Sequence, residues 1–171
     1  MEEEINMTAS RANELKLQSK LLTKIRDTGV ELTIDKTKAR LKSDNAFRSM
    51  LAKNAVTAFN RGFDSAISSL LLDDSYDIAV VNINDYTRSK KRQMELKGRV
   101  IGSRGMIKKR LMKETSCYIK IQGKTISIVG HVERIGMAQG AIEMILNGAK
   151  HDSVFISIDR KKLEAYQNGS S

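Results

Sequence analysis

The spacing of hydrophobic residues predicts the same order of helices and strands twice along the chain. In the first half, Leu15, Leu22 and Ile25 recur at helical spacing, with polar residues between them. This pattern predicts one amphipathic helix over residues 13–27. Glycine is common just past a helix end, so we expect residues 28–29 (Thr-Gly) to terminate it.

A hairpin and two helices are predicted for the rest of the first half. Alternating apolar residues indicate strands, and runs at helical spacing indicate helices. We expect strands over residues 30–34 and 38–42, joined by a turn over 35–37. A helix over 44–60 and a short helix over 64–72 follow them. The candidate N-caps of the longer helix are Ser43 and Asp44, and its apolar stripe comprises Phe47, Leu51, Ala55 and Phe59. An opening strand ahead of the first helix is expected to be shortened or absent.

The second half repeats this order and adds a β-branched opening strand. We expect a strand over residues 76–83, a basic helix over 87–101, a glycine loop over 102–105 and a helix over 106–115. A strand over 118–122, a tight turn over 123–124, a strand over 125–129 and a helix over 132–146 follow. Gly130 is expected to break the last strand. Beyond residue 147 we expect a C-terminal tail, with His151 orienting its loop and residues 168–171 flexible.

An internal duplication of one small α+β unit explains this repeated order. Residues 14–60 correspond to residues 106–147, and only the second copy keeps the glycine loop. The prediction is therefore an α+β protein with two domains over residues 1–72 and 73–171. Each is expected to be a three-stranded antiparallel sheet packed by helices.

Charge changes the picture because it is concentrated in the second half. The chain has 30 Lys and Arg against 20 Asp and Glu, a net charge of +10. Between Tyr86 and Lys124 there are 13 basic residues and two acidic ones, so the rest of the chain is close to neutral. A basic run of this kind is either a solvated face or the binding surface for a polyanion such as nucleic acid.

Several classes of protein are disfavoured by composition. The chain has one cysteine, Cys117, and two histidines, His131 and His151, spaced unlike metal ligands, so neither a disulfide nor a metal site is expected. No carboxylate pair or histidine near Ser103 indicates catalysis, so the protein is not expected to be an enzyme or to need a cofactor. The acidic start lacks a secretory signal, and no apolar run is long enough to span a membrane, which favours the cytoplasm.

The Gly-x-x-Gly loop between two predicted helices is the strongest candidate for binding chemistry. Gly102 and Gly105 lack a Cβ, so a phosphate backbone could approach the peptide closely there. Ser103 and Arg104 between them could bond phosphate oxygens, and the next helix would present free N–H groups. The alternative is that the two glycines only end one helix and start the next. Nearby point charges are supplied by Lys97, Arg99, Lys108 and Lys109.

The order strand, helix, Gly-x-x-Gly, helix, strand, strand, helix is the eukaryotic-type (type I) K-homology (KH) arrangement, whose loop clamps about four nucleotides. An apolar groove floor beside the loop is expected from Val100, Ile101, Ile107, Ile119 and Ile121. Each has ordinary core as its alternative, and for Ile107 and Ile121 the two roles are about equally favoured. Aromatic residues make up only 5% of the chain, which argues against an RRM or an OB-fold, since both stack bases on aromatics. We therefore expect single-stranded RNA binding.

Residues 97–105, Lys-Gly-Arg-Val-Ile-Gly-Ser-Arg-Gly, resemble the second KH repeat of the archaeal and eukaryotic small-ribosomal-subunit assembly factors called partner of Nob, or Dim-two. Residues 123–130, 141–146 and 148–155 carry further similarity, and the short chain is more similar to archaeal members. The first repeat departs from the pattern. Residues 11–14 (Arg-Ala-Asn-Glu) stand where its glycine loop would lie, so it is expected to be a degenerate KH domain that packs on the second repeat or binds protein.

The resemblance implies binding near the 3′ end of small-subunit rRNA. It further implies contact with an rRNA-trimming endonuclease, an rRNA dimethyladenosine transferase and the alpha subunit of initiation factor two. Two other functions remain open. One is a KH adaptor in RNA decay or transcription, and the other is a protein-interaction scaffold that binds a translation initiation factor.

Overall fold

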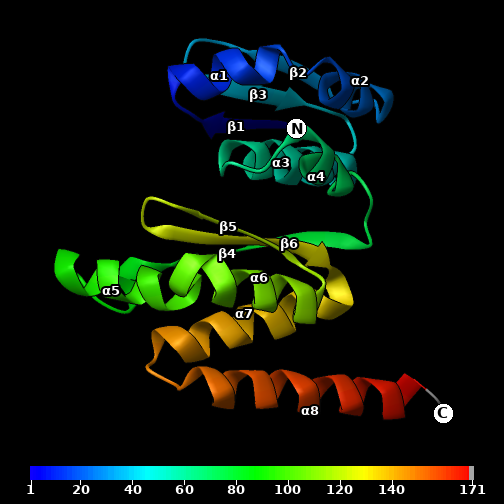
Figure 1. Cartoon of the computed structure of the whole chain (residues 1–171). Helices are drawn as coiled ribbons and strands as arrows, with labels where there is room; N and C mark the ends of the chain where they lie inside the picture. The colour runs from blue at the N-terminus through cyan, green and yellow to red at the C-terminus, as the bar shows by residue number, and fades with distance from the viewer. Residues whose placement is uncertain (170–171) are drawn as a thin grey trace. The chain divides into compact units, whose positions relative to one another are not determined.

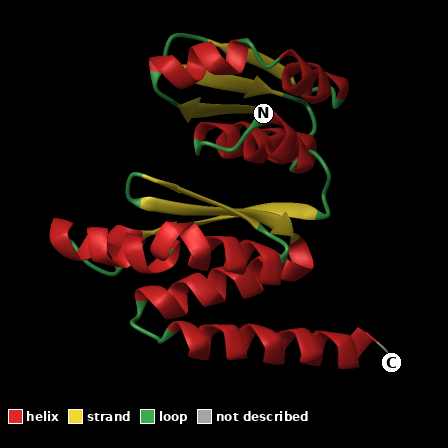
Figure 2. Cartoon of the chain, in the orientation of Figure 1, coloured by secondary structure: helices red, strands yellow, loops and turns green. Residues whose placement is uncertain are grey.

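The computed structural model describes residues 1–169 and divides into two compact units, Met1–Ile78 and residues 79 onward (Figure 1). Each unit has one three-stranded antiparallel sheet with helices, as Figure 2 shows by colour. The two sheets have the same strand order, β1-β3-β2 and β4-β6-β5. The predicted α+β class with two three-stranded sheets is confirmed.

The first unit contains all of the elements expected for it and two that were not. In chain order they are β1 (Glu2–Asn6), α1 (Ala9–Lys16), α2 (Ser19–Asp27), β2 (Glu31–Ile34), β3 (Lys38–Lys42), α3 (Ala46–Asn60) and α4 (Ser65–Leu70). The hairpin β2–β3 pairs Leu32 with Leu41. Asn45, rather than Ser43 or Asp44, caps α3, since its side chain accepts a hydrogen bond from Arg48 N.

The opening strand of the first unit is present with five residues, against seven in the opening strand of the second unit, so it is shortened and not absent. β1 pairs antiparallel with β3 and sets Glu2 opposite Lys42 and Glu4 opposite Arg40. Glu4 accepts hydrogen bonds from Lys38 Nζ (2.6 Å) and Arg40 Nε (3.2 Å), and these bonds lower the pKa of Glu4. Glutamate has a low intrinsic preference for strands, and here cross-strand charge pairs compensate for it.

The single helix predicted over residues 13–27 is two helices, α1 and α2, with a break at Leu17 and Gln18. Leu15 and Leu21 are both fully buried. In one continuous helix these two side chains would point about 120° apart, too far for both to lie at the centre of one buried face. The break turns α2 until both face the core, and it leaves Leu17 80% exposed.

The second unit follows its predicted order closely. Its elements are β4 (Tyr76–Asn82), η1 (Ile83–Asp85), α5 (Lys90–Ile101), η2 (Ser103–Gly105), α6 (Met106–Thr115), β5 (Tyr118–Gln122), β6 (Thr125–His131), α7 (Val132–Leu146) and α8 (His151–Gly169). The helices α5, α6 and α7 lie on one face of this sheet (Figure 2). The core between them includes Ile83, Leu96, Leu111, Ile126 and Ile142.

Gly130 lies inside β6, so the prediction that it breaks the strand was wrong. A Cβ at this position would lie 2.5 Å from the sulfur of Cys117. Only glycine allows the two backbones to approach this closely. Burial raises the pKa of Cys117, as expected for a thiol packed in the core.

The predicted C-terminal tail is a 19-residue helix, α8. Val154, Phe155 and Ile158 are buried, and the Arg110 guanidinium stacks 3.7 Å from the centre of the Phe155 ring. Lys162 Nζ also donates to Glu114 on α6 (2.6 Å). Of the four residues expected to be flexible, 168 and 169 belong to α8, and 170 and 171 lie outside the described residues. In the described part of the chain, no helix is long and apolar enough to cross a membrane.

Candidate nucleic-acid interface

The glycine loop of the second unit joins α5 to α6 through a single 3₁₀ turn, η2. Gly102 has φ 73° and ψ 172°, and Gly105 has φ 72° and ψ 15°. A Cβ on Gly102 would lie 2.4 Å from Ile107 Cγ1 and 2.8 Å from Ile107 N, whereas a Cβ on Gly105 would meet nothing within 4 Å. Gly102 is therefore required for packing, while Gly105 leaves its backbone open to an approaching ligand.

The two residues between the glycines point their polar groups outward. Ser103 and Arg104 are exposed, and neither side chain forms a hydrogen bond or ion pair within residues 1–169. The first turn of α6 has no side-chain cap. Free N–H groups at a helix start, a hydroxyl and a guanidinium together suit a phosphate group.

Lys108, in the first turns of α6, is half-buried close to Lys120 on β5. Burial, and then the positive charge of Lys120, lower the pKa of Lys108. A bound anion close to Lys108 would stabilise its charged form and so oppose this shift. Lys109 beside them is exposed. Lys120 was not among the predicted contacts, because nothing in its own strand indicates that its charge acts on Lys108.

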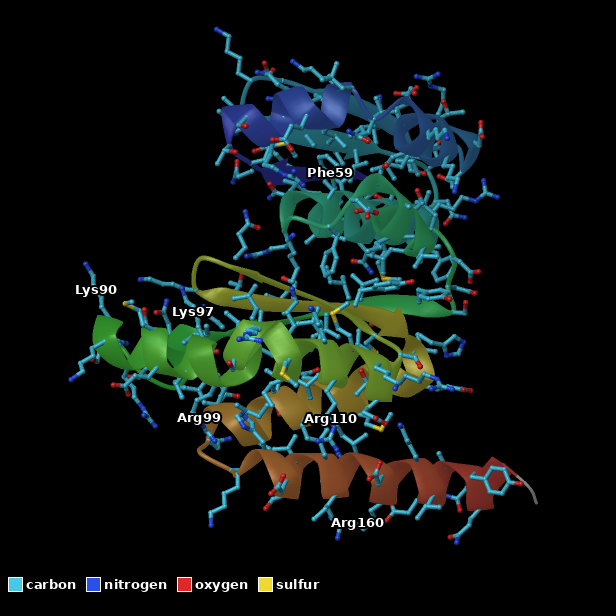
Figure 3. All side chains as sticks on the ribbon, viewed as in Figure 1. Phe59, Lys90, Lys97, Arg99, Arg110 and Arg160 are labelled. Atoms are coloured by element: carbon cyan, nitrogen blue, oxygen red, sulfur yellow. The ribbon has the colours of Figure 1, made fainter. Side chains whose placement is uncertain are left out.

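The two predicted cations on α5 differ in their surroundings. Lys97 is half-buried, and Figure 3 shows it on the part of α5 that precedes the loop. Arg99 instead donates from its guanidinium to Ile145 O and Ala149 O, each at 2.5 Å. His151 Nε2 in turn donates to the Arg99 carbonyl oxygen (2.9 Å). Arg99 thus holds the carboxyl end of α7, and its contact with RNA stays a prediction.

The predicted groove floor divides into exposed and buried side chains. Ile101, Ile107 and Ile121 are partly exposed. Val100 is fully buried and Ile119 is 3% exposed, so both pack in the core beneath the surface. The surface available to a base beside the loop is therefore the one formed by the three partly exposed isoleucines.

In the first unit, the junction between α1 and α2 at Leu17 and Gln18 takes the place of the glycine loop. The residues expected there, 11–14, lie inside α1, where the Arg11 guanidinium stacks over Phe59 (4.1 Å) and donates to its carbonyl oxygen. A groove of about 560 Å³ follows the junction, lined by Lys16, Leu22, Arg26, Val30, Glu31, Leu32 and Ile34. The sequence did not indicate this groove, since its walls come from a helix whose start was misplaced.

The acidic and metal-binding side chains are scattered. Among residues 1–169, no group of three or more His, Cys, Asp or Glu lies close enough to hold a metal ion. His131 serves as the N-cap of α7.

Comparison with known proteins identifies the region that contains the glycine loop. The family model for the second KH domain of PNO1 proteins, described as a eukaryotic type KH domain (KH domain type I), matches residues 77–163. The KH domain-containing protein MJ0443 of Methanocaldococcus jannaschii is 35% identical over 111 residues, which are 65% of this chain and 49% of that protein. The chain thus spans about half the length of this curated relative.

Solved structures share the fold over both units. A protein of unknown function from Aeropyrum pernix, APE0754, gives a TM-score of 0.90 at 23% identity, covering 99% of this chain and 95% of that chain. Dim2p from Pyrococcus horikoshii gives 0.79 at 23% identity, covering 94% and 99%. A complex of a/eIF2alpha, aDim2p and rRNA from the same organism contains a chain with a TM-score of 0.82 at 24% identity, covering 96% and 95%. Because the family model covers half of the chain, this protein belongs to the PNO1 family of type I KH domains.

Proposed function

We propose that this protein binds single-stranded RNA through the glycine loop of its second unit and acts as a small-subunit ribosome assembly factor. The observation that carries the proposal is the loop itself. Gly105 leaves an open backbone beside the uncapped start of α6, with Ser103 and Arg104 exposed and unpaired in the described structure. A type I KH loop grips about four backbone nucleotides in this way.

The proposed site comprises the loop, its neighbouring cations and the isoleucine floor. Its predicted residues are Lys97, Arg99, Ile101, Gly102, Ser103, Arg104, Gly105, Lys108, Lys109, Ile119 and Ile121. We include with them Ile107, which was expected in the groove floor, and Lys120, whose charge acts on Lys108. Support is strongest for the loop, Lys108 and the exposed isoleucines. It is weakest for Arg99, whose guanidinium donates to Ile145 O within the fold, and for Ile119, which is buried.

The proposed RNA is the 3′ region of small-subunit rRNA, and the proposed place of action is the cytoplasm. Support comes from the aDim2p structure that contains rRNA and a/eIF2alpha. By the same reasoning, the alpha subunit of initiation factor two is a proposed partner. The rRNA-trimming endonuclease and the rRNA dimethyladenosine transferase are proposed from the family resemblance.

We further propose that the first unit is a degenerate type I KH domain, with domains over residues 1–72 and 73–171. Its element order and sheet order match those of the second unit, and its helix junction lacks glycine. Without the bare backbone of a glycine loop, this unit is proposed to contact protein. The whole chain is proposed to be a binding protein with no catalytic role.

The decisive experiment replaces both loop side chains with aspartate. Ser103→Asp with Arg104→Asp should weaken binding of a single-stranded rRNA 3′-end oligonucleotide at least about tenfold, because charge-assisted hydrogen bonds contribute about 1.5–3 kcal/mol. Ser153→Asp with Arg160→Asp on α8 makes the same change in charge at exposed positions and is the matched control. Fluorescence anisotropy measures affinity, and circular dichroism checks the fold.

The outcome separates the candidate functions. Unchanged affinity in the loop variant removes the loop from the mechanism. If the loop variant loses binding, and the wild-type protein binds unrelated single strands as tightly as the rRNA strand, an adaptor in RNA decay or transcription is favoured. If the affinity of the wild-type protein for RNA hardly changes with salt concentration, a protein-interaction scaffold is favoured.

A further inference from the structure

The end of α5 farthest from the glycine loop carries a second group of cations. Arg88, Lys90, Lys91 and Arg92 lie within five residues, and all four are exposed. We name this group the basic turn. Figure 3 shows Lys90 at this end of α5, with its side chain extending away from the ribbon. None of the four belongs to the predicted RNA site.

The position of these charges opposes helix stability. Lys90, Lys91 and Arg92 occupy the first turn of α5, which holds no acidic residue. The amino end of a helix carries partial positive charge, so each cation there is unfavourable by about 0.3–1 kcal/mol. Folding therefore gives no reason to place cations at this end, and a violated local rule of this kind is typical of functional surfaces.

The basic turn is also poorly compensated by acids. Arg92 pairs with Glu95 (2.9 Å), and both side chains are about half-exposed. An exposed pair of this kind contributes little. Arg88, Lys90 and Lys91 enter no ion pair in the part of the chain that the structure describes. Most of the charge is thus available to an outside anion.

The backbone beneath the basic turn is held in place. Gln93 is 5% exposed, and its Nε2 donates to Asn84 Oδ1 (2.8 Å) and to Thr87 O (3.0 Å). Ser89 N donates to Thr87 Oγ1 (3.2 Å), which fixes the residue before the helix. Cations that stand on an ordered backbone lose less entropy on binding than cations on a mobile tail.

The basic turn acts separately from the glycine loop but on the same helix. α5 has 12 residues, so its two ends lie about 18 Å apart. This exceeds the screening length of about 8 Å at physiological salt. The basic turn therefore does not merely strengthen the field at the loop. It adds contacts only to a polyanion long enough to reach both ends of the helix.

We propose that the basic turn binds the phosphate backbone of RNA that extends beyond the nucleotides held at the glycine loop. This inference rests on the proposed RNA binding and gives that RNA a longer footprint along α5. RNA is favoured as the occupant because the cations continue, along one helix, those beside the loop. Phosphate contacts of this kind raise affinity without selecting sequence.

The test compares two RNAs and two matched variants. Arg88→Gln, Lys90→Gln and Lys91→Gln together remove three charges from the basic turn. Lys150→Gln, Arg160→Gln and Lys161→Gln remove three exposed charges elsewhere in the same unit. The RNAs are a single strand of about four nucleotides and a strand roughly four times as long with the same sequence at its centre.

The basic-turn variant should bind the short RNA like the wild-type protein and the long RNA at least about tenfold more weakly. Its log–log salt slope for the long RNA should be smaller by about 2, since each lost phosphate contact removes about 0.7. The control variant should keep the wild-type affinity. Its salt slope should differ from that of the wild-type protein by less than half of the change of about 0.7 expected for one phosphate contact.

Three results would overturn the inference. Wild-type affinity of the basic-turn variant for the long RNA shows that RNA does not reach it. An equal loss in the control variant shows a general charge effect. Loss of binding to phosphatidylserine vesicles, with RNA binding intact, assigns the basic turn to a membrane surface. A failure of the proposed RNA binding at the glycine loop gives a different result. In that case the Ser103→Asp, Arg104→Asp variant binds the short RNA as tightly as the wild-type protein does.

Discussion

The two loop glycines have different physical roles, although the sequence presents them as a symmetric pair. Gly102 has a positive φ and packs against Ile107, while Gly105 faces open space. Gly102→Ala should lower the free energy of unfolding by roughly 2–4 kcal/mol, because the alanine would be both strained and overpacked. Urea denaturation measures this change.

Gly98 on α5 provides the internal control for that prediction. A Cβ at Gly98 would meet nothing within 4 Å, and its position is helical. Gly98→Ala should therefore stabilise the protein by roughly 0.5–1 kcal/mol. Equal effects of the two substitutions would contradict the packing role assigned to Gly102.

Lys108 gives RNA binding a dependence on alkaline pH. Burial and Lys120 lower the pKa of Lys108 in the free protein, and a bound phosphate should raise it. The affinity is then fully present below the free-protein pKa and falls as the pH rises through it. Between about pH 8 and pH 10, Lys108→Arg should show a shallower decline, because arginine does not titrate there.

A 2′-O-methyl oligonucleotide of adenosine and cytidine suits this measurement, because it resists alkaline cleavage. Parallel pH profiles of the wild-type protein and Lys108→Arg would show that Lys108 does not contact the phosphates. In a separate comparison of RNA sequences, Ile121→Ala should alter base preference, whereas Lys108→Ala should weaken all sequences about equally.

At the residue scale, local signals were sufficient for the loop but insufficient for its surroundings. A Gly-x-x-Gly pattern between helices is visible in the sequence because its meaning depends on adjacent residues. The roles of Arg99 and Lys120 depend on α7 and on α6, which lie elsewhere in the chain. No spacing rule within α5 or β5 could have assigned them.

Among the elements, the Arg99 side chain joins α5 to the end of α7. His151, at the start of α8, joins α8 to α5 through the Arg99 carbonyl oxygen. Arg99→Lys should lower the free energy of unfolding by about 1–3 kcal/mol, because lysine cannot reproduce the forked contact with two carbonyl groups. The affinity of the folded variant for short RNA should be unchanged. A large loss of affinity without a loss of stability would show that the RNA contacts the Arg99 guanidinium itself, and does not only respond to its positive charge.

The packing of α8 on α6 should depend on acid pH through Glu114. The hydrogen bond and positive charge from Lys162 lower the pKa of Glu114 below its unfolded value. Its contribution to stability is therefore present above the unfolded pKa and lost as the pH falls through the folded pKa. From about pH 5 to pH 3, Glu114→Gln should lose less stability than the wild-type protein.

Glu164→Gln on α8 is the matched control for Glu114, because its carboxylate is exposed and enters no ion pair within residues 1–169. Thermal unfolding followed at several pH values distinguishes the two. A Glu164→Gln profile that matches that of Glu114→Gln would show that the ion pair does not hold α8.

Strongly patterned elements could be predicted to the residue, and weakly patterned ones could not. The bounds of α6, β5 and α7 match the sequence pattern, since each has clear periodicity and a turn or cap at its ends. β1 depends on charge pairs with β3, and the break between α1 and α2 depends on burying both Leu15 and Leu21. These are tertiary requirements, which periodicity within one segment does not contain.

For the whole molecule, the net charge belongs to the second unit. The first unit holds 12 basic and 12 acidic residues, and the second holds 18 and 8. The salt dependence of RNA binding should therefore come from the second unit. Lys16→Gln with Arg26→Gln, which removes both basic side chains from the lining of the first-unit groove, should leave the salt slope unchanged, as measured by anisotropy. A decrease of about 0.7 per charge would show that RNA reaches the first unit.

Mapping of backbone amide chemical shifts, as a short single-stranded RNA is added to the isotopically labelled protein, tests the central claim most directly. The largest shifts are predicted for residues 102–109, with smaller ones along β5 near Lys120 and Ile121. Shifts confined to the first unit, or a glycine loop whose amides do not move at saturating RNA, would contradict the proposed role of the loop.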